Sequence, residues 1–337
     1  MKSVNIFKVV DIAQAHEGSL GMLHSYINAV APTGIDALKF QVHIAEAESG
    51  PYEKFRVEFG HEDATRYDYW KRMEFTEQQW LEIKKHCEDM GTEFMATPFS
   101  VKAVELLERV GVKRYKVGSG DVQNFLLLEN IARTAKPIIL STGMSSLDEI
   151  DEAIQFLKPF GNEVSVLQCT TKYPSGPEEV GLNVITELKQ RFNLPTGLSD
   201  HSGMIFPSLA AVAMRASIIE VHVVFDKAMF GPDSSSSLTI DELTLLVKGI
   251  EFITKMLNNP VDKDKNPEIF SEEREIFGRS LSYRRDLRAG ERIGFEMLES
   301  KKPAGYGLSP KRFKEILGKR LKRDVKEGDF VKEEDLL

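Results

Sequence analysis

The sequence predicts an α/β protein: a (β/α)₈ barrel over residues 1–257, a linker over residues 258–277, and a small, mostly β domain over residues 278–337. The barrel is predicted by short β-branched or apolar runs that alternate with segments of helical periodicity. This alternation covers about 250 residues, which is the usual size of such a barrel. The second domain is predicted by a change of composition that follows a polar stretch containing Pro260 and Pro267.

Eight segments are predicted to be strands, because each is a short apolar or β-branched run. In chain order they are Val4–Val10, Ala37–Val42, Glu93–Ala96, Arg114–Val117, Pro137–Leu140, Val164–Gln168, Thr196–Leu198 and Ile218–Val223. Strands that alternate with helices pair in parallel through right-handed crossovers, and eight of them can close into a barrel.

Two of the intervening helices are indicated by apolar residues at helical spacing, in Glu77–Met90 and Val101–Val110. Thr76 is followed three residues later by Gln, and Ser146 by Glu. This is the spacing of a capping box, in which each side chain binds a backbone N–H of the other residue. We therefore expect helices to begin directly after Thr76 and Ser146.

An open, doubly wound sheet is the alternative fold for the same alternation. Such a sheet would favour a glycine-rich dinucleotide-binding loop after its first strand. Residues 11–16 read Asp-Ile-Ala-Gln-Ala-His instead, and Gly118 and Gly120 lack a third glycine in register. The sequence contains no GxxxxGK[ST] loop either. The barrel is therefore the preferred prediction.

Composition and charge disfavour several classes of protein. The 337 residues are 42% hydrophobic and carry a formal net charge of −8, whereas proteins that coat nucleic acid are normally basic. The two cysteines, Cys87 and Cys169, form no metal-binding motif and no disulfide framework. No signal peptide and no run of about 18 apolar residues is present. We expect a soluble cytoplasmic protein that binds neither nucleic acid nor a membrane.

The segment 278–337 differs in charge from the rest of the chain, with 16 basic and 11 acidic residues. Two similar turn patterns, which begin at Asp286 and Asp324, precede short apolar pairs in it. A module of about 60 residues is marginally stable alone, so we expect it to dock on a barrel.

Polar side chains follow every predicted strand, and in a parallel barrel these positions share one end, where chemistry is carried out. They are Asp11, Lys39, Gln41, Thr97, Lys116, Ser119, Asp121, Ser141, Thr142, Thr170, Thr171, Tyr173, Ser199, Asp200, His201, Glu220 and His222. Lys39 and Lys116, together with the hydroxyl groups, suit an anionic ligand, and phosphate above all.

Two histidines, His201 and His222, follow consecutive strands and should be neighbours. Imidazole nitrogens beside oxygen donors suit a divalent transition metal with open coordination positions. His16, after the first strand, is a candidate third inward group. The other four histidines, His24, His43, His61 and His86, are interpreted as surface or packing residues.

Several segments together resemble the N-acetylneuraminate (sialic acid) synthase family, which includes legionaminate, pseudaminate and spore-coat polysaccharide synthases. They are KFQVHIAEAES, MATPFS, YKVGSGD, KPIILSTGMSSLDEI, LQCTTKYP, GLSDHSG, EVHVVFDK and GPDSSSSL, and the resemblance runs through about residues 5–240. The segments LRAGERIGFEML, KKPAGYG and VKEGDFVKEEDL are similar to the antifreeze-like (SAF) domain of the same family.

The resemblance implies a metal-dependent condensation of phosphoenolpyruvate with an aldose, giving a 3-deoxy-2-keto sugar acid (a nonulosonate) and phosphate. It implies that His201 and His222 hold Mn²⁺ or Mg²⁺, and that Asp11 and Asp121 are catalytic carboxylates. The implied phosphoenolpyruvate-binding residues are Lys39, Thr97, Lys116, Ser119, Ser141 and Ser199, and the implied sugar-binding residues are Gln41, Tyr173, Asp233 and Lys302. It also implies a domain-swapped homodimer, in which Lys302 approaches the partner's site.

The sequence departs from the family pattern mainly among residues near the sugar. Asp11 and Asp121 stand where the family usually has Glu, and Lys302 where an Arg recognises the N-acetyl group of the sugar. The other departures are Ala15-His16 in place of Asn-His, Thr171 in place of Asn, and Val221 in place of a basic residue. Replacing Glu by Asp shortens the reach of the carboxylate by about 1.5 Å, one C–C bond.

We therefore hypothesise that the reaction is retained and that the sugar is not N-acetylmannosamine. Two other functions remain compatible with the residues. One is a metal-dependent aldolase or phosphatase on the same barrel. The other is a sugar- or phosphate-binding family member whose catalysis is altered or lost.

Overall fold

The computed structural model describes residues 4–57, 62–265 and 268–337 and divides the chain into two compact units. Met1–Asn259 forms the first, called the barrel unit here, and Pro260–Leu337 forms the second, called the C-terminal unit. His61, which the sequence places at the surface or in packing, lies outside the described residues.

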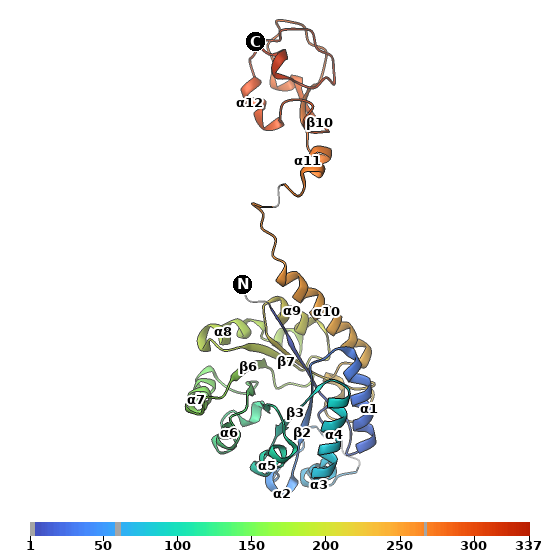
Figure 1. Ribbon diagram of the computed structural model, residues 1–337, viewed down its shortest axis with the longest axis vertical. Coiled ribbons are helices and arrows are strands. Elements are labelled where there is room, and N and C mark those ends of the chain that lie inside the picture. The colour runs from blue at the N-terminus through green and yellow to red at the C-terminus, as the bar shows by residue number, and fades with distance from the viewer. Residues whose placement is uncertain (1–3, 58–61, 266–267) are drawn as a thin grey trace. The chain divides into compact units, whose positions relative to one another are not determined.

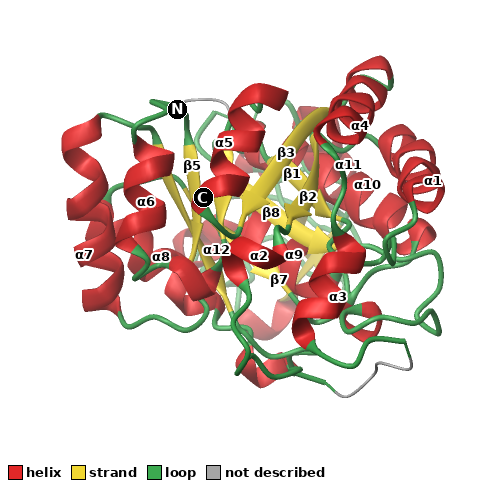
Figure 2. Ribbon diagram, turned by 90° about the horizontal axis from the view of Figure 1, so that it is seen from below, coloured by secondary structure: helices red, strands yellow, loops and turns green. Residues whose placement is uncertain are grey.

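The barrel unit confirms the predicted (β/α)₈ fold, since eight parallel strands close into a barrel (Figures 1 and 2). The strands are β1 (Phe7–Asp11), β2 (Ala37–Val42), β3 (Glu93–Pro98), β4 (Tyr115–Val117), β5 (Ile138–Ser141), β6 (Val164–Cys169), β7 (Thr196–Asp200) and β8 (Ile218–His222). They pair in chain order, and β1 pairs with β8 to close the barrel. Several strands run further into their polar ends than expected, β7 as far as Asp200.

The helices of the barrel unit lie outside the strands (Figure 2). They are α1 (Leu20–Val30), α2 (Ala45–Glu48), α3 (Arg66–Met73), α4 (Glu77–Asp89), α5 (Val101–Val110), α6 (Phe125–Ala132), α7 (Leu147–Leu157), α8 (Leu182–Phe192), α9 (Phe206–Ala213) and α10 (Ile240–Asn258). Both predicted capping boxes are present, at Thr76 before α4 and at Ser146 before α7. The connection from β2 to α4 carries the additional helices α2 and α3.

Two layers of side chains fill the interior of the barrel, and the period of two along a strand explains both. The lower layer is apolar and contains Val9, Ala37, Met95, Ile139, Leu167 and Ile218. Two residues further along the same strands come Asp11, Lys39, Thr97, Ser141, Cys169 and Glu220, all of them buried. An apolar floor therefore lies directly beneath a layer of polar and charged groups.

Gly197 in β7 is required by close packing of the barrel wall. A Cβ atom at this position would lie 2.1 Å from the carbonyl oxygen of Ile218 and 2.7 Å from a methyl carbon of Leu167. Only a glycine lets β7 approach β8 at this level. Two residues further on, Ser199 points toward the carboxylate of Glu220.

The C-terminal unit has a core of its own, which includes Leu281, Tyr283, Ile316 and Val331. Its antiparallel strands β9 (Ser280–Tyr283) and β10 (Leu298–Lys301) are accompanied by isolated β-bridges and the short helix α12 (Phe313–Ile316). Helix α11 (Ser271–Phe277) lies within the stretch 258–277 that the sequence marks as a linker. In the described part of the chain, no helix has the length and apolar character needed to cross a membrane.

Candidate active site

A cavity of about 610 Å³ opens at the carboxyl ends of the barrel strands. It brings together thirteen of the fourteen residues that the sequence marks as catalytic, substrate-binding or metal-binding. These are Asp11, Lys39, Gln41, Thr97, Lys116, Ser119, Asp121, Ser141, Tyr173, Ser199, His201, His222 and Asp233. The fourteenth, Lys302, lies in the C-terminal unit, where its ammonium nitrogen is 5.1 Å from the centre of the Phe277 ring.

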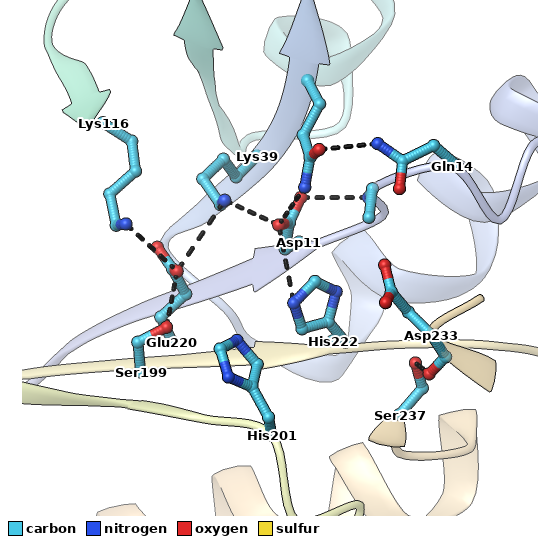
Figure 3. A network of polar contacts seen from close by, with 12 residues as sticks. Asp11, Gln14, Lys39, Lys116, Ser199, His201, Glu220, His222, Asp233 and Ser237 are labelled. Carbon is cyan, nitrogen blue, oxygen red and sulfur yellow. Dashed lines mark hydrogen bonds and ion pairs between the residues drawn. The ribbon is translucent and has the colours of Figure 1, made fainter. Parts of the chain in front are cut away.

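Four buried charged side chains form a network at the base of the cavity (Figure 3). The ammonium group of Lys39 lies 2.6 Å from Oδ2 of Asp11 and 3.7 Å from Oε1 of Glu220. The ammonium group of Lys116 lies 3.5 Å from the same Glu220 oxygen. Two positive and two negative groups thus balance in a place that water hardly reaches.

The pKa values of these groups reflect the competition between burial and ion pairing. Burial alone would raise the pKa of Asp11, but Lys39 and His222 hold it well below its usual range. Burial raises the pKa of Glu220 less than Lys116 and Lys39 lower it, so the net shift is downward. For Lys116 burial dominates, and its pKa is lowered despite the nearby Glu220.

Hydroxyl groups surround the lysines. Ser141 Oγ accepts a hydrogen bond from Lys116 at 2.7 Å, and Ser199 Oγ donates one to Glu220 at 2.9 Å. Ser119 Oγ accepts a hydrogen bond from the backbone N–H of Gly143 at 2.9 Å. The hydroxyl of Thr97 is buried without a partner among the described residues. A buried polar group without a partner costs free energy, so this hydroxyl is available to a ligand.

The two predicted metal ligands are neighbours, with ring centres 5.1 Å apart. His201 Nδ1 lies 2.9 Å from the carbonyl oxygen of Thr170. Since a carbonyl can only accept, Nδ1 carries the proton and Nε2 keeps its lone pair. His222 Nδ1 is buried without a partner among the described residues, and Nε2 lies 3.8 Å from Oδ2 of Asp11.

These two imidazoles fit a divalent metal that completes its coordination with substrate or water oxygens. Within residues 4–57, 62–265 and 268–337, no three His, Cys, Asp or Glu side chains gather as a metal site. The described residues therefore bring two imidazoles together here without a third side chain of these types.

Tyr173 and Asp233, which the sequence assigns to the sugar, lie on the same side of the cavity and are linked by Arg56. The Arg56 guanidinium pairs with Oδ1 of Asp233 at 2.5 Å and lies 4.2 Å from the centre of the Tyr173 ring. Tyr173 in turn stacks on His201, with ring centres 4.1 Å apart. Arg56 belongs to the long connection after β2, and sequence reasoning did not find it.

Asp121, the second predicted catalytic carboxylate, also lines the cavity. It accepts a hydrogen bond from Asn124 at 2.9 Å. Burial raises the pKa of Asp121, and this hydrogen bond offsets only part of the rise. Asp121 therefore differs from Asp11, whose pKa is lowered, and the two carboxylates suit different proton-transfer roles.

One histidine assignment is wrong and another is incomplete. His16, the candidate third inward group, is absent from the cavity lining; it packs on Phe75 with ring centres 5.1 Å apart, and its Nδ1 accepts a hydrogen bond from the Gly18 N–H. His43, assigned to surface or packing, is buried and lines the cavity. Alternation along β2 places His43 in line with Lys39 and Gln41, and this pattern could have revealed it.

Two further residues line the cavity. The sequence placed Glu220 at this end of the barrel without a specific role, and sequence reasoning did not find Gln14. Glu220 precedes His222 by two residues, so strand alternation points both side chains inward. Gln14 lies in the loop after β1, where no periodicity applies.

Comparisons with known proteins agree with this architecture. A model of the NeuB family matches residues 26–262, and a model of the SAF domain matches residues 278–337. The chain is 35% identical to an N,N′-diacetyllegionaminic acid synthase of Campylobacter jejuni, over 97% of this chain and 99% of that one. It is 33% identical to a human N-acetylneuraminate-9-phosphate synthase, over 97% and 92% of the two chains.

Among solved structures, a sialic acid synthetase of Leptospira borgpetersenii is similar, with a TM-score of 0.71 and 30% identity. The similarity covers 80% of this chain and 92% of that one. These relatives are named as synthases of sugar acids.

Proposed function

The chain belongs to the NeuB family, and from that premise we propose that it condenses phosphoenolpyruvate with an aldose to give a 3-deoxy-2-keto sugar acid and phosphate. Relatives that are named for an activity are synthases of sugar acids, which supports the reaction class. The observation that carries the proposal is the charged network at the base of the cavity, where two buried lysines lie among hydroxyl groups, one of which, that of Thr97, has no partner among the described residues.

Phosphoenolpyruvate is a small anion with a carboxylate and a phosphate, and this network suits it. Lys39 and Lys116 supply positive charge in a place of low dielectric, where charge-assisted hydrogen bonds are strong. Thr97, Ser119 and Ser141 would donate to the oxygens of phosphoenolpyruvate, and Ser199 would do so once its hydroxyl group releases Glu220. The anion would compete with Asp11 and Glu220 for the two ammonium groups, so its binding would loosen the ion pairs that are present without it.

His201 and His222 would hold the divalent metal, Mn²⁺ or Mg²⁺, and a metal bound there would supply Lewis-acid polarisation of the sugar carbonyl. His201 is already oriented for this role by its hydrogen bond to Thr170. Tyr173 stacks on His201 and restricts the ring further.

In the reaction, the methylene carbon of phosphoenolpyruvate forms a bond to the aldehyde carbon of the sugar, and the aldehyde oxygen takes up a proton. Asp121 is the group we assign to supply that proton, because its raised pKa keeps more of it protonated than an exposed Asp. Positive character develops at the phosphate-bearing carbon. Asp11 takes a proton from the water that attacks this carbon, which leaves a hydroxyl group on it. Cleavage of the C–O bond then releases phosphate, which takes up the proton of that hydroxyl group, and leaves the keto group.

Asp11 can act as a base only when its ion pair with Lys39 weakens, since Lys39 lowers the pKa of the carboxyl group. Phosphoenolpyruvate would bring this about by drawing the Lys39 ammonium group toward its own negative charge. Proton uptake by Asp11 would thereby be coupled to the binding of phosphoenolpyruvate.

The departures from the family pattern lead us to propose that the sugar is not N-acetylmannosamine. Asp121 and Lys302 both differ from the residues usual at their positions, and both are assigned to the sugar side of the reaction. A domain-swapped homodimer, with Lys302 reaching the partner's cavity, and a cytoplasmic location belong to the same proposal.

The test is phosphate release from phosphoenolpyruvate across a panel of aldoses, with Mn²⁺ and with a chelator. The panel contains N-acetylmannosamine, its 6-phosphate, mannose and a diacetamido-trideoxyhexose. We expect release to require both metal and one sugar other than N-acetylmannosamine. Release without any sugar would favour a phosphatase, and binding of phosphoenolpyruvate without turnover of any sugar would favour a member that has lost catalysis.

A further inference from the structure

A chain of hydrogen bonds crosses the wall of the cavity from Glu48 to Asp11. His43 Nδ1 lies 2.7 Å from Oε1 of Glu48, and His43 Nε2 lies 3.0 Å from Nε2 of Gln14. The same Gln14 nitrogen lies 2.6 Å from Oε1 of Gln41, and Gln41 Nε2 lies 3.0 Å from Oδ2 of Asp11. All five side chains line the cavity.

The two ends of this chain determine the direction of every hydrogen bond in it, because a carboxylate can only accept. His43 Nδ1 must donate to Glu48, so His43 Nε2 accepts from its other neighbour. Gln41 must donate to Asp11 with its nitrogen, so its oxygen faces Gln14 and accepts. The amide nitrogen of Gln14 therefore has to donate both of its hydrogens, one to His43 Nε2 and one to Gln41 Oε1. Within this series of hydrogen bonds it is the only atom that donates to two acceptors.

This arrangement leaves the amide oxygen of Gln14 with no donor among the described residues. Figure 3 shows that oxygen turned away from the nitrogen that binds Gln41. Gln14 is buried, and it lines the cavity together with His222 and Asp233. Gln41, in contrast, has its oxygen and one of its hydrogens engaged by protein groups.

We propose that Gln14 is a sugar-binding and specificity-determining residue, whose Oε1 accepts a hydrogen bond from a hydroxyl or amide N–H group of the aldose. This inference rests on the proposed condensation and narrows its substrate. The sugar has to present a hydrogen-bond donor at this point. A sugar phosphorylated or O-acylated at the same position presents only acceptors, which leaves two acceptors facing each other, and such sugars are rejected.

His43 is a positioning residue in this proposal, since it acts on the sugar only through Gln14. Its ring is stacked between Trp70 and Phe99, at centre-to-centre distances of 3.8 and 4.6 Å. Glu48 holds the ring in the tautomer whose Nε2 accepts. Stacking on Trp70 and Phe99 fixes the position of the ring, and the Glu48 carboxylate determines which ring nitrogen donates and which accepts.

The first experiment compares Gln14→Met, Gln14→Glu and the wild-type enzyme, with Mn²⁺ and the aldose that gives phosphate release in the panel. Loss of one hydrogen bond in Gln14→Met is expected to raise the KM for the sugar about tenfold. Both variants lack the two donor hydrogens, but Gln14→Glu also places a carboxylate against two acceptors, His43 Nε2 and Gln41 Oε1, so it is expected to raise the KM for the sugar further. The KM for phosphoenolpyruvate stays within about twofold, because Gln14 does not face the lysines. Gln78→Met, an exposed change on α4, is the matched control.

The second experiment separates positioning from packing at His43. His43→Gln keeps an acceptor for Gln14 and loses the stacked ring, whereas His43→Phe keeps a ring and loses the acceptor. We expect His43→Phe to have the higher melting temperature and His43→Gln the lower KM for the sugar. If His43 had a purely structural role, the variant with the higher melting temperature would also have the lower KM for the sugar.

Calorimetric titration of the sugar into the enzyme without phosphoenolpyruvate supplies a readout that does not depend on turnover, because no condensation can occur. It is expected to show the same loss of affinity in Gln14→Met. An unchanged sugar KM and affinity in Gln14→Met, beside an active wild type, would overturn the role of Gln14 alone. A wild type that neither binds nor turns over any sugar of the panel would overturn the proposed condensation, and the role of Gln14 with it.

Discussion

At the scale of single residues, the base of the cavity depends on charges that balance in pairs. Glu220 lies between the ammonium groups of Lys39 and Lys116 and also accepts a hydrogen bond from Ser199. Removing one member of a buried ionic group leaves the others uncompensated, which costs more than the pair itself contributes. The same excess of positive charge would attract an anionic substrate.

Glu220→Gln is therefore expected to destabilise the protein by about 3 kcal/mol, measured by chemical denaturation. Phosphoenolpyruvate should raise the melting temperature of this variant more than that of the wild type, because the anion replaces the lost negative charge. Glu242→Gln, which breaks the more exposed ion pair with Lys227, is the control and should change stability by less than about 1 kcal/mol. If phosphoenolpyruvate raised the melting temperatures of Glu220→Gln and the wild type equally, the anion would not bind beside Lys39 and Lys116.

The proposed binding of a metal by His201 and His222 can also be tested with single substitutions. His201→Ala and His222→Ala should each lower the affinity for Mn²⁺ at least about tenfold, because each removes one of the two proposed protein ligands. Equilibrium dialysis with elemental analysis measures this without reference to activity. His86→Ala, on the outer helix α4, is the matched control. If either site variant retains its full Mn²⁺ content, the metal is held elsewhere.

At the scale of elements, the period of two along each strand places an apolar residue in the barrel floor and a polar residue in the cavity above it. Positions in the apolar floor are followed two residues later by the charged or hydroxyl-bearing residues of the cavity, as in Val9 and Asp11. The register then sets neighbours, since Asp11 pairs with Lys39 on one side and His222 on the other. A displacement in register would separate these groups.

Gly197→Ala tests how tightly that register is held. The added Cβ would lie 2.1 Å from the Ile218 carbonyl oxygen, so the backbone of β7 or β8 has to move. We expect a loss of about 3 kcal/mol in unfolding free energy, at the upper end of ordinary overpacking. Gly50→Ala, where a Cβ meets nothing within 4 Å, should leave stability unchanged. Denaturant titration measures the unfolding free energy of both variants. Equal unfolding free energies would show that β7 and β8 move apart at little cost.

At the scale of the whole molecule, the histidines make the two units respond differently to acid. All seven lie within the first 222 residues, and the C-terminal unit has none. Burial, with further contributions from His43 and Arg72, lowers the pKa of His16 to about 3. The folded barrel unit therefore keeps His16 neutral at pH values where the unfolded chain protonates it.

The sign of the effect follows from this difference in proton binding. Below the unfolded pKa of about 6.5, the unfolded chain binds the proton and the folded unit does not, so stability falls as the pH decreases toward 3. We expect His16→Asn, which can still accept a hydrogen bond from the Gly18 N–H, to make the free energy of unfolding less dependent on pH. Between pH 6 and 4 its slope should decrease by up to about 1.4 kcal/mol per pH unit. Urea titrations at several pH values measure the slope. Parallel slopes in variant and wild type would show that His16 is protonated in the folded state.

The residues themselves were sufficient to predict eight strands, a barrel, and the side of it that carries Asp11, Lys39, Lys116, His201 and His222. The reason is local, since alternation and helical spacing are properties of short segments, and parallel topology brings all strand ends to one side. The predicted capping boxes at Thr76 and Ser146 are local in the same sense, and both are present.

The tertiary structure alone decided which of these groups touch and in which direction their hydrogen bonds run. Arg56 reaches Asp233 and Tyr173 across a long separation in sequence, and no periodicity marks it. Gln14 obtains its role from Glu48 and Asp11, two carboxylates at opposite ends of a chain of contacts. Such roles arise from the closure of the barrel and from the limited number of donors and acceptors that each side chain offers, neither of which a short segment contains.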